Sequence, residues 1–169
     1  KHYFLRFGGH KYAAGLSLRK KDLVSFSIDF EKEVKKKIKP QMLVPKIKID
    51  SQLSLSSLAV NKNGEVFPKI YRIIKQMEPF GPANPRPVFL FKDLSLHTIP
   101  RIVGENHIKL KFCSSDKQTL IDGIWFNSAM CFSTLKNSKS IDVVGSINEN
   151  TFRGKTNLQL MVSDIRLSD

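Results

Sequence analysis

The sequence has 169 residues, enough for one ordinary domain or two small ones, and 41% of them are hydrophobic, so a packed core is expected. No apolar run approaches the ~20 residues of a membrane span, no secretory signal opens the chain, and two cysteines are too few for a disulfide framework. The net charge of +13, with a pI near 9.9, favours a polyanionic partner, either nucleic acid or an anionic membrane face.

The first 50 residues predict a hairpin, a helix and a short strand. Residues 3–18 combine two extended segments with a glycine-rich corner between them. Asp22 is expected to begin a helix that Pro40 ends, because apolar side chains recur between them at three- and four-residue steps. Ile47 and Ile49 alternate with polar residues, as in a strand. Because the first residue is not Met, we expect a fragment whose start lies upstream, or a processed chain.

The next segment predicts a connector. The serine-rich residues 51–58 predict either a linker or the start of a helix, and Asn63-Gly64 is typical of a turn. A second helix, with its apolar side running from Val66 to Met77, is expected to follow. Residues 78–87 contain four prolines and one glycine, which are incompatible with a helix or a central strand. We therefore expect a rigid junction there, and we place the domain boundary at it.

Beyond the junction the pattern predicts five strands. A period of two places Ile108, Leu110 and Phe112 on one side of a strand, with Lys109 and Lys111 on the other. A short helix at 128–136 separates the third strand from the fourth, and this is the element order of the five-stranded OB barrel. The predicted strands are Val88–His97, a segment around 108–112, Leu120–Phe126, Ile141–Ile147 and Leu158–Ile165, with a turn over Asn150–Lys155.

Two segments resemble parts of one enzyme family. Residues 8–18, GGHKYAAGLSL, resemble the GGHxxAAG signature of the DHH-associated domain, which accompanies DHH-type phosphoesterases. Residues 79–89, PFGPANPRPVF, resemble the PFGxGNPxPxF segment that leads into the OB domain of RecJ exonucleases, with Ala83 where glycine is usual. Residues 107–110 are similar to the HLKL strand of that family, and residues 149–166 to its last hairpin.

The resemblance is collinear from about residue 7 to residue 167. The GGH signature alone is shared with nanoRNase-type phosphoesterases and with a domain of alanyl-tRNA synthetases, so the downstream barrel is what selects RecJ. The implied fold class is α+β, with a partial α/β DHH-associated domain followed by a five-stranded OB-fold β-barrel. The implied domains are residues 1–50 for the end of the DHH-associated domain, 51–86 for the helical connector and junction, and 87–169 for the OB domain.

The Gly8-Gly9-His10 segment is the first candidate site. Glycine permits positive φ and close backbone approach, and a backbone held open in this way can offer N–H donors to a phosphate. His10 can donate a hydrogen bond to a phosphate oxygen or to charge that develops during hydrolysis. The resemblance implies this substrate contact as a catalytic role for His10, without metal ligation. Lys11 is a further phosphate candidate, or else a solvated lysine.

The barrel carries the second candidate site. Lys109 and Lys111 share one face of a strand and can follow a phosphate backbone. Arg153 and Lys155 lie on the last hairpin, which borders the oligonucleotide face of OB barrels, and Arg101 lies in the loop on the other flank. Phe152, at the hairpin tip, is a candidate platform for base stacking. Other aromatic residues, namely Phe89, Phe91 and Trp125, are expected in the core.

A two-metal phosphodiesterase needs clustered aspartate and histidine ligands, and no such cluster is expected here, where the four histidines are scattered. The resemblance implies that Mn²⁺ or Mg²⁺ is held by an upstream catalytic domain of the same polypeptide, so this chain alone is expected to bind DNA without cleaving it. The implied function is the substrate-binding portion of a single-stranded-DNA-specific 5′–3′ exonuclease of DNA repair and recombination. Single-stranded DNA is the expected partner, with a single-stranded-DNA-binding protein or a helicase as further partners, no membrane, and a cytoplasmic location.

Three alternatives remain open at this point. The chain could be a stand-alone OB-fold module that binds single strands, or part of another DHH-family phosphoesterase. It could also be a basic module that docks on protein or anionic lipid. The Gly8-Gly9-His10 signature argues against a plain binding module, and salt-dependent affinity for an oligonucleotide separates nucleic-acid binding from the last alternative.

Overall fold

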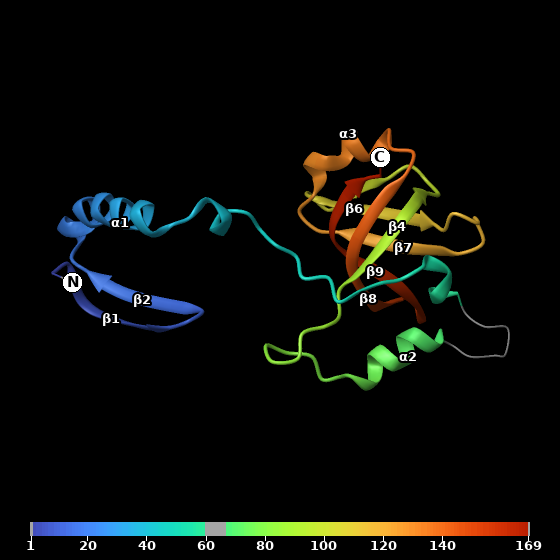
Figure 1. The fold of residues 1–169 in the computed structure, drawn as a ribbon, viewed down its shortest axis with the longest axis horizontal. Coiled ribbons are helices and arrows are strands. Elements are labelled where there is room, and N and C mark those ends of the chain that lie inside the picture. Colours follow the sequence, from blue (N-terminus) through green and yellow to red (C-terminus); the bar gives the residue numbers. More distant parts are fainter. Residues whose placement is uncertain (1, 60–66, 169) are drawn as a thin grey trace. The chain divides into compact units, whose positions relative to one another are not determined.

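The computed structural model describes residues 2–59 and 67–168. The chain divides into two compact units, Lys1–Lys46 and Ile47–Asp169. Figure 1 shows the elements of each unit. The predicted Asn63-Gly64 turn and the apolar position Val66 lie outside the described residues.

The first unit is a β-hairpin followed by a helix. Strands β1 (Phe4–His10) and β2 (Ala13–Leu18) pair antiparallel, and a two-residue turn joins His10 to Ala13. A short 3-10 turn, η1 (Lys20–Asp22), leads into α1 (Leu23–Lys37), which begins and ends close to the predicted positions, and Pro40 starts a further 3-10 turn, η2 (Pro40–Met42). The glycine-rich corner is different from the prediction, because both glycines lie inside β1 rather than at the turn.

The second unit is a closed barrel with one added strand on each edge of its sheet. The strands are β3 (Ser51–Gln52), β4 (Phe89–Leu96), β5 (Arg101–Val103), β6 (His107–Cys113), β7 (Leu120–Trp125), β8 (Ile141–Phe152) and β9 (Lys155–Leu167). Their order is β3-β4-β8-β9-β7-β6-β5, and a further β4–β6 pairing closes a ring of five strands. Around the ring the strands follow the order β4-β6-β7-β9-β8. The order therefore differs from the chain order only at β9 and β8, and β7 pairs in parallel with β9.

Helices and turns complete the second unit. The predicted helix between the third and fourth barrel strands is present as η4 (Ala129–Cys131) and α3 (Phe132–Lys136). The connector contributes η3 (Leu55–Leu58) and α2 (Lys69–Gln76). Leu55, Leu58, Tyr71 and Ile74 of these two elements belong to the same buried cluster as the barrel side chains, so residues on both sides of the proline-rich junction share one core.

The barrel core follows the predicted alternation. Ile108, Leu110 and Phe112 are buried on one side of β6, as expected from the period of two. The expected core positions Phe89 and Phe91 are also buried, and Trp125 is half-buried against the same cluster.

Three local predictions were wrong. Ile47 and Ile49 form no strand; the chain instead joins the sheet two residues later, where Ser51 and Gln52 pair parallel with β4. The loop expected around Arg101 contains the short strand β5, which pairs with β6. The final hairpin is far longer than predicted, because β8 and β9 stay paired to within two residues of each other, at Phe152 and Lys155.

The proline-rich junction is held by hydrogen bonds rather than by regular structure. Gly81 and Asn84 exchange two backbone hydrogen bonds, of 2.8 and 3.0 Å, and form a tight turn. The Asn84 amide also donates to the carbonyl oxygens of Met77 and Pro79, at 2.7 and 3.1 Å. The Arg86 guanidinium lies 4.3 Å from the centre of the Phe80 ring. These contacts order the segment that enters β4.

Candidate nucleic-acid interface

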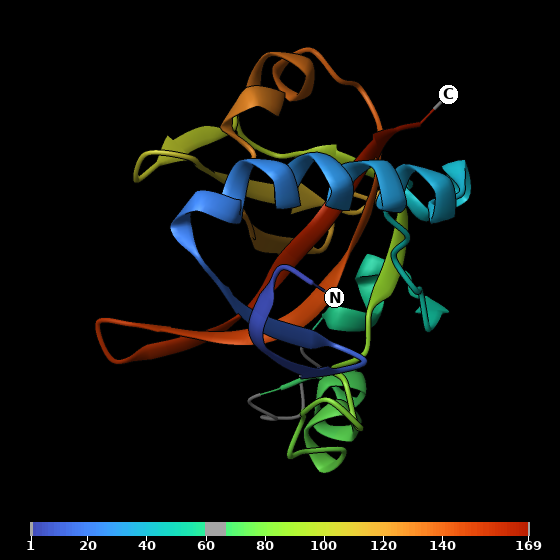
Figure 2. The same ribbon diagram turned by 90° about the vertical axis from the view of Figure 1, so that its left-hand side faces the viewer.

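The β8–β9 hairpin presents an aromatic and a basic side chain at its tip. Arg153 and Gly154 have φ of 50° and 75°, the left-handed values that a two-residue type I′ turn requires. Phe152 precedes the turn and is 68% exposed. The Arg153 guanidinium lies 5.3 Å from the centre of the Phe152 ring. The hairpin reaches well beyond the rest of the barrel (Figure 2), so its tip is open to a ligand.

The outer side of β6 supplies a second group of cations. Lys109 and Lys111 alternate with the buried Ile108 and Leu110, so both lysines face away from the core. Arg101 is the direct cross-strand partner of Lys109 in the β5–β6 pair and therefore lies on the same face. The structure thus places Arg101 on a strand beside the lysines, where the sequence predicted a separate loop on the other flank.

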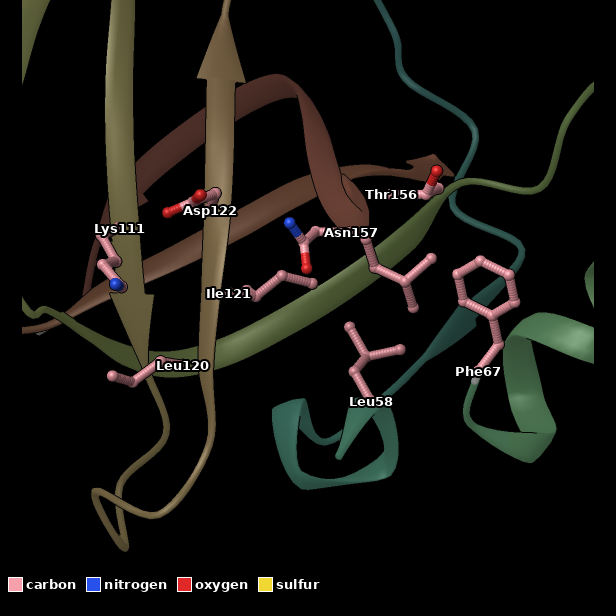
Figure 3. Close-up of a pocket in the computed structure, with 9 residues that line it drawn as sticks. Leu58, Phe67, Lys111, Leu120, Ile121, Asp122, Thr156 and Asn157 are labelled. Atoms are coloured by element: carbon pink, nitrogen blue, oxygen red, sulfur yellow. The ribbon is translucent and has the colours of Figure 1, made fainter. Parts of the chain in front are cut away.

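These two groups meet in one groove of about 410 Å³. Lys109 lines it from β6, and Phe152, Arg153 and Lys155 line it from the hairpin, so four of the predicted binding residues share one depression. Its remaining lining residues are Asp122, Asn150, Asn157, Leu158 and Gln159. Lys111 lines a neighbouring depression of about 390 Å³ (Figure 3), which shares Asp122, Asn157 and Leu158 with the groove.

The charge on this face is not neutralised by the described part of the chain. Its five cations, Arg101, Lys109, Lys111, Arg153 and Lys155, form no ion pair within 4.0 Å of a carboxylate of residues 2–59 or 67–168. Asp122 is the carboxylate among the lining residues of the groove. Unpaired cations on one face produce a positive field that attracts a polyanion.

Sequence reasoning missed the amide side chains of the groove. Asn157 and Gln159 follow Lys155 at two-residue steps on β9, and Asn150 is the cross-strand partner of Asn157. The same period of two that identified the lysines of β6 could have found them, once β9 was known to begin at Lys155. Asp122 faces the groove because it pairs with Lys111 on β6 and with Gln159 on β9.

The Gly8-Gly9-His10 segment belongs to the first unit and differs from its predicted conformation. Neither glycine has positive φ, so the backbone does not form the expected open nest of N–H donors. The predicted close approach is present at Gly9, where a Cβ would lie 2.7 Å from both the Ala13 oxygen and the Ala14 Cα. His10 ends β1, and its Nδ1 accepts a hydrogen bond from the Tyr12 N–H at 3.3 Å. The Lys11 Nζ lies 5.4 Å from the centre of the Tyr12 ring.

Two further properties bear on the possible chemistry. Among the described residues, no three His, Cys, Asp or Glu side chains gather closely enough to hold a metal ion. Within residues 2–59 and 67–168, the side chains therefore do not fit a divalent metal centre. No helix in the described ranges is long and apolar enough to cross a membrane.

The closed ring of five strands and its basic, aromatic-tipped groove define an OB-fold domain of the kind that binds nucleic acid. The family model of the RecJ OB domain matches residues 49–164, and the chain belongs to this family.

Named relatives agree with that assignment. The "Single-stranded-DNA-specific exonuclease RecJ" of Haemophilus influenzae is 30% identical over 169 residues, which cover 98% of this chain and 27% of the relative. The protein of the same name from Escherichia coli is 28% identical over 95% of this chain and 26% of its own length. The crystal structure of RecJ from Thermus thermophilus in complex with Mn²⁺ has the same fold, with a TM-score of 0.67 and 22% identity over 99% of this chain and 22% of that one. The chain thus spans about a quarter of the length of these relatives.

Proposed function

We propose that this chain is the carboxy-terminal, substrate-binding portion of a RecJ-like exonuclease and that it grips single-stranded DNA in the groove between β6 and the β8–β9 hairpin. The observation that carries the proposal is the gathering of five unpaired cations and an exposed aromatic ring on one face of an OB barrel. This combination is what single-strand binding requires, because the cations follow the phosphates while the ring stacks on a base.

The two groups of cations have distinct tasks in this proposal. Arg101, Lys109 and Lys111 bind successive phosphates on the barrel wall. Arg153 and Lys155 hold the strand at the hairpin, beside the Phe152 ring on which a base stacks. The amides of Asn150, Asn157 and Gln159 can each donate and accept hydrogen bonds at base edges or sugars.

The first unit would supply the substrate contact near the scissile bond. In this proposal residues 1–50 are the end of a DHH-associated domain, 51–86 are the connector and 87–169 are the OB domain. His10, with Lys11, donates hydrogen bonds to a substrate phosphate. Gly8 and Gly9 precede His10 on β1, and Gly9 lets the two strands of the hairpin approach closely. The metal ligands would lie in an upstream catalytic domain that binds Mn²⁺ or Mg²⁺, so this chain alone would not hydrolyse DNA.

The same proposal covers the activity, location and partners of the whole enzyme of which this chain would be a part. It would digest single strands from 5′ to 3′ in DNA repair and recombination, in the cytoplasm, with a single-stranded-DNA-binding protein or a helicase as a partner. Its support is the likeness to curated relatives named as single-stranded-DNA-specific exonucleases.

Salt-dependent binding tests the proposal. The chain is titrated into a fluorescently labelled single-stranded oligonucleotide at several salt concentrations, and the dissociation constant is measured by anisotropy. The logarithmic slope for single strands is about −0.7 per neutralised phosphate, so five contacts give about −3.5. A flat salt dependence, or no binding, would overturn the binding proposal. Degradation of the oligonucleotide by the chain after addition of Mn²⁺ or Mg²⁺ would overturn the non-catalytic role.

A further inference from the structure

The depression beside the groove lies where two neighbouring strands of the barrel, β7 and β9, are not yet paired. Strands β7 and β9 pair in parallel only from Asp122 and Gln159 onward. Before that point Leu120 and Ile121 of β7 have no partner in β9, and the residues of β9 up to Leu158 pair only with β8. The two strands therefore separate and leave a pocket of about 390 Å³, which lies within the range of roughly 300–1,000 Å³ for small-ligand sites.

The pocket combines apolar and polar side chains. Leu58, Phe67 and Leu158 give it apolar surface, and Figure 3 shows Leu58 lying between the β7 strand and Phe67. Lys111, Asp122 and Asn157 give it charged and amide groups, with Leu120 and Ile121 beside Lys111 and Asp122, and Thr156 adds a hydroxyl group. A nucleobase has the same two kinds of surface, since its faces are apolar and its edge carries hydrogen-bond donors and acceptors.

We infer that this pocket receives one base of the DNA strand held in the neighbouring groove and that Asp122 and Asn157 read its edge, selecting bases that carry an amino group. The inference rests on the proposed single-strand binding. The pocket is continuous with the groove, because Asp122, Asn157 and Leu158 line both depressions. This continuity supports a base of the bound strand as the ligand of the pocket. Lys109 lines the groove and Lys111 lines the pocket, two residues apart on one face of β6, so a backbone that follows the lysines passes from one to the other.

The presence of Asp122 indicates that the pocket contacts the edge of a base and does not bind phosphate alone. A carboxylate in a phosphate-binding groove repels the strand, and no described lysine or arginine pairs with this one within 4.0 Å. An ionised carboxylate only accepts hydrogen bonds, so it needs a donor. The exocyclic amino group of cytosine is such a donor, whereas thymine offers a carbonyl oxygen at the same position.

Two labelled oligonucleotides of equal length, oligo-dC and oligo-dT, test this inference at neutral pH and fixed salt. Both are pyrimidine strands of the same charge, so phosphate binding alone gives them similar affinities. We expect the chain to bind oligo-dC about tenfold more tightly, the effect of one hydrogen bond to a charged group. Asp122→Ala should remove this preference while tightening the binding of oligo-dT, because it removes a negative charge from the groove. Asn157→Ala should reduce the preference without that tightening.

Asp164→Ala is the matched control, since Asp164 is an exposed carboxylate on the same strand as Asn157. Among the described residues, its one hydrogen-bond donor is the neighbouring Ile165 N–H. The variant should leave the ratio of the two affinities unchanged. Equal affinities for oligo-dC and oligo-dT, or a preference that survives Asp122→Ala, would overturn base reading while leaving groove binding intact. Absence of binding to both oligonucleotides would instead show that the proposed function itself is wrong.

Discussion

Arg101 and Lys109 face each other directly across the antiparallel β5–β6 pair. Two like charges in this position destabilise a sheet, and neither side chain has a carboxylate within 4.0 Å among the described residues. A phosphate placed between the two would remove the repulsion. The repulsion therefore lowers the stability of the free protein, and in the proposed complex with a single strand a bound phosphate would remove it.

Arg101→Ala should separate stability from binding. Loss of the repulsion is expected to raise the free energy of unfolding of the Ile47–Asp169 unit slightly, by about 0.3 kcal/mol. Loss of one phosphate contact should weaken single-strand binding about threefold to fivefold, the effect of an exposed ion pair, and reduce the salt slope by about 0.7. Urea unfolding and anisotropy titrations measure the two effects. Lys139→Ala, which removes an exposed lysine of the turn before β8, is the control and should leave the salt slope unchanged.

Phe152 gives a prediction that depends on its ring. Its side chain is 68% exposed, so Phe152→Ala should leave the fold intact. The loss of one base–aromatic stack should weaken single-strand binding by about 1–3 kcal/mol. Phe152→Leu keeps apolar bulk but has no π face, and it should bind almost as weakly as the alanine variant. Binding at the level of the unsubstituted chain by Phe152→Leu would show that the side chain acts as a hydrophobic contact and not as a stacking platform.

The hairpin turn holds an arginine in a backbone conformation that suits other residues better. Arg153 has φ of 50°, where type I′ turns strongly prefer asparagine. Arg153→Asn should therefore stabilise the second unit by about 0.5–1 kcal/mol while weakening oligonucleotide binding. Gly154→Ala, at φ of 75°, should destabilise it by about 1 kcal/mol. Thermal unfolding and anisotropy measure both variants. If Arg153→Asn bound DNA as tightly as the original, the arginine would have no role in the groove.

The parts of the fold that the sequence predicted are those dominated by local pattern. The alternation of Ile108, Leu110 and Phe112 identified β6 because one face of that strand is buried and the other is not. Lys109 and Lys111, which alternate with these apolar residues, indicated the basic face of the same strand. Local pattern also found α1, since its apolar stripe and the following Pro40 depend only on neighbouring residues.

The parts that were missed depend on pairing between distant segments. Whether Arg101 lies in a loop or a strand is decided by its partner on β6, because the apolar pair Ile102-Val103 that follows it is too short to predict a strand by itself. The length of the β8–β9 hairpin follows from continuous pairing through polar residues such as Asn150 and Asn157, which resemble a loop in sequence. The pocket exists only because β7 and β9 part at Asp122. Such register is a tertiary property that no single segment encodes.

The two glycines of the β1–β2 hairpin should differ sharply when substituted. A Cβ on Gly9 would lie 2.7 Å from the Ala13 oxygen, whereas a Cβ on Gly8 would have no atom within 4 Å. Gly9→Ala should therefore force β1 and β2 apart near His10, while Gly8→Ala should be tolerated. Backbone amide chemical shifts of β1 and β2, together with hydrogen exchange, measure the difference. Equal perturbation by both variants would mean that backbone freedom, and not close approach, explains the pair of glycines.

Asp142 predicts how the second unit responds to acid. Asp142 is 6% exposed, and its carboxylate accepts hydrogen bonds from Arg166 at 2.7 Å, from the Ser168 hydroxyl at 3.0 Å and from the Asp93 N–H at 3.2 Å. Asp93 has φ of 54° and lies where the β4–β8 register shifts, so Asp142 holds the backbone of a bulge. Burial of the Asp142 carboxyl by itself would raise its pKa. The hydrogen bonds from Arg166, Asp93 and Ser168 outweigh this effect and lower the pKa below its usual value.

Because the folded pKa of Asp142 lies below the unfolded value of about 3.9, this group stabilises the fold above that pH and loses its contribution as pH falls through the folded pKa. Asp142→Asn cannot titrate and should lower the free energy of unfolding at pH 7 by about 1–3 kcal/mol. The difference between the original chain and Asp142→Asn should shrink as the pH falls below about 4. Urea unfolding followed by the fluorescence of Trp125, the chain's one tryptophan, measures it at each pH. Other acids titrate equally in both proteins, so a difference that stayed constant down to about pH 2, well below the unfolded pKa, would show that Asp142 acts by shape rather than by charge.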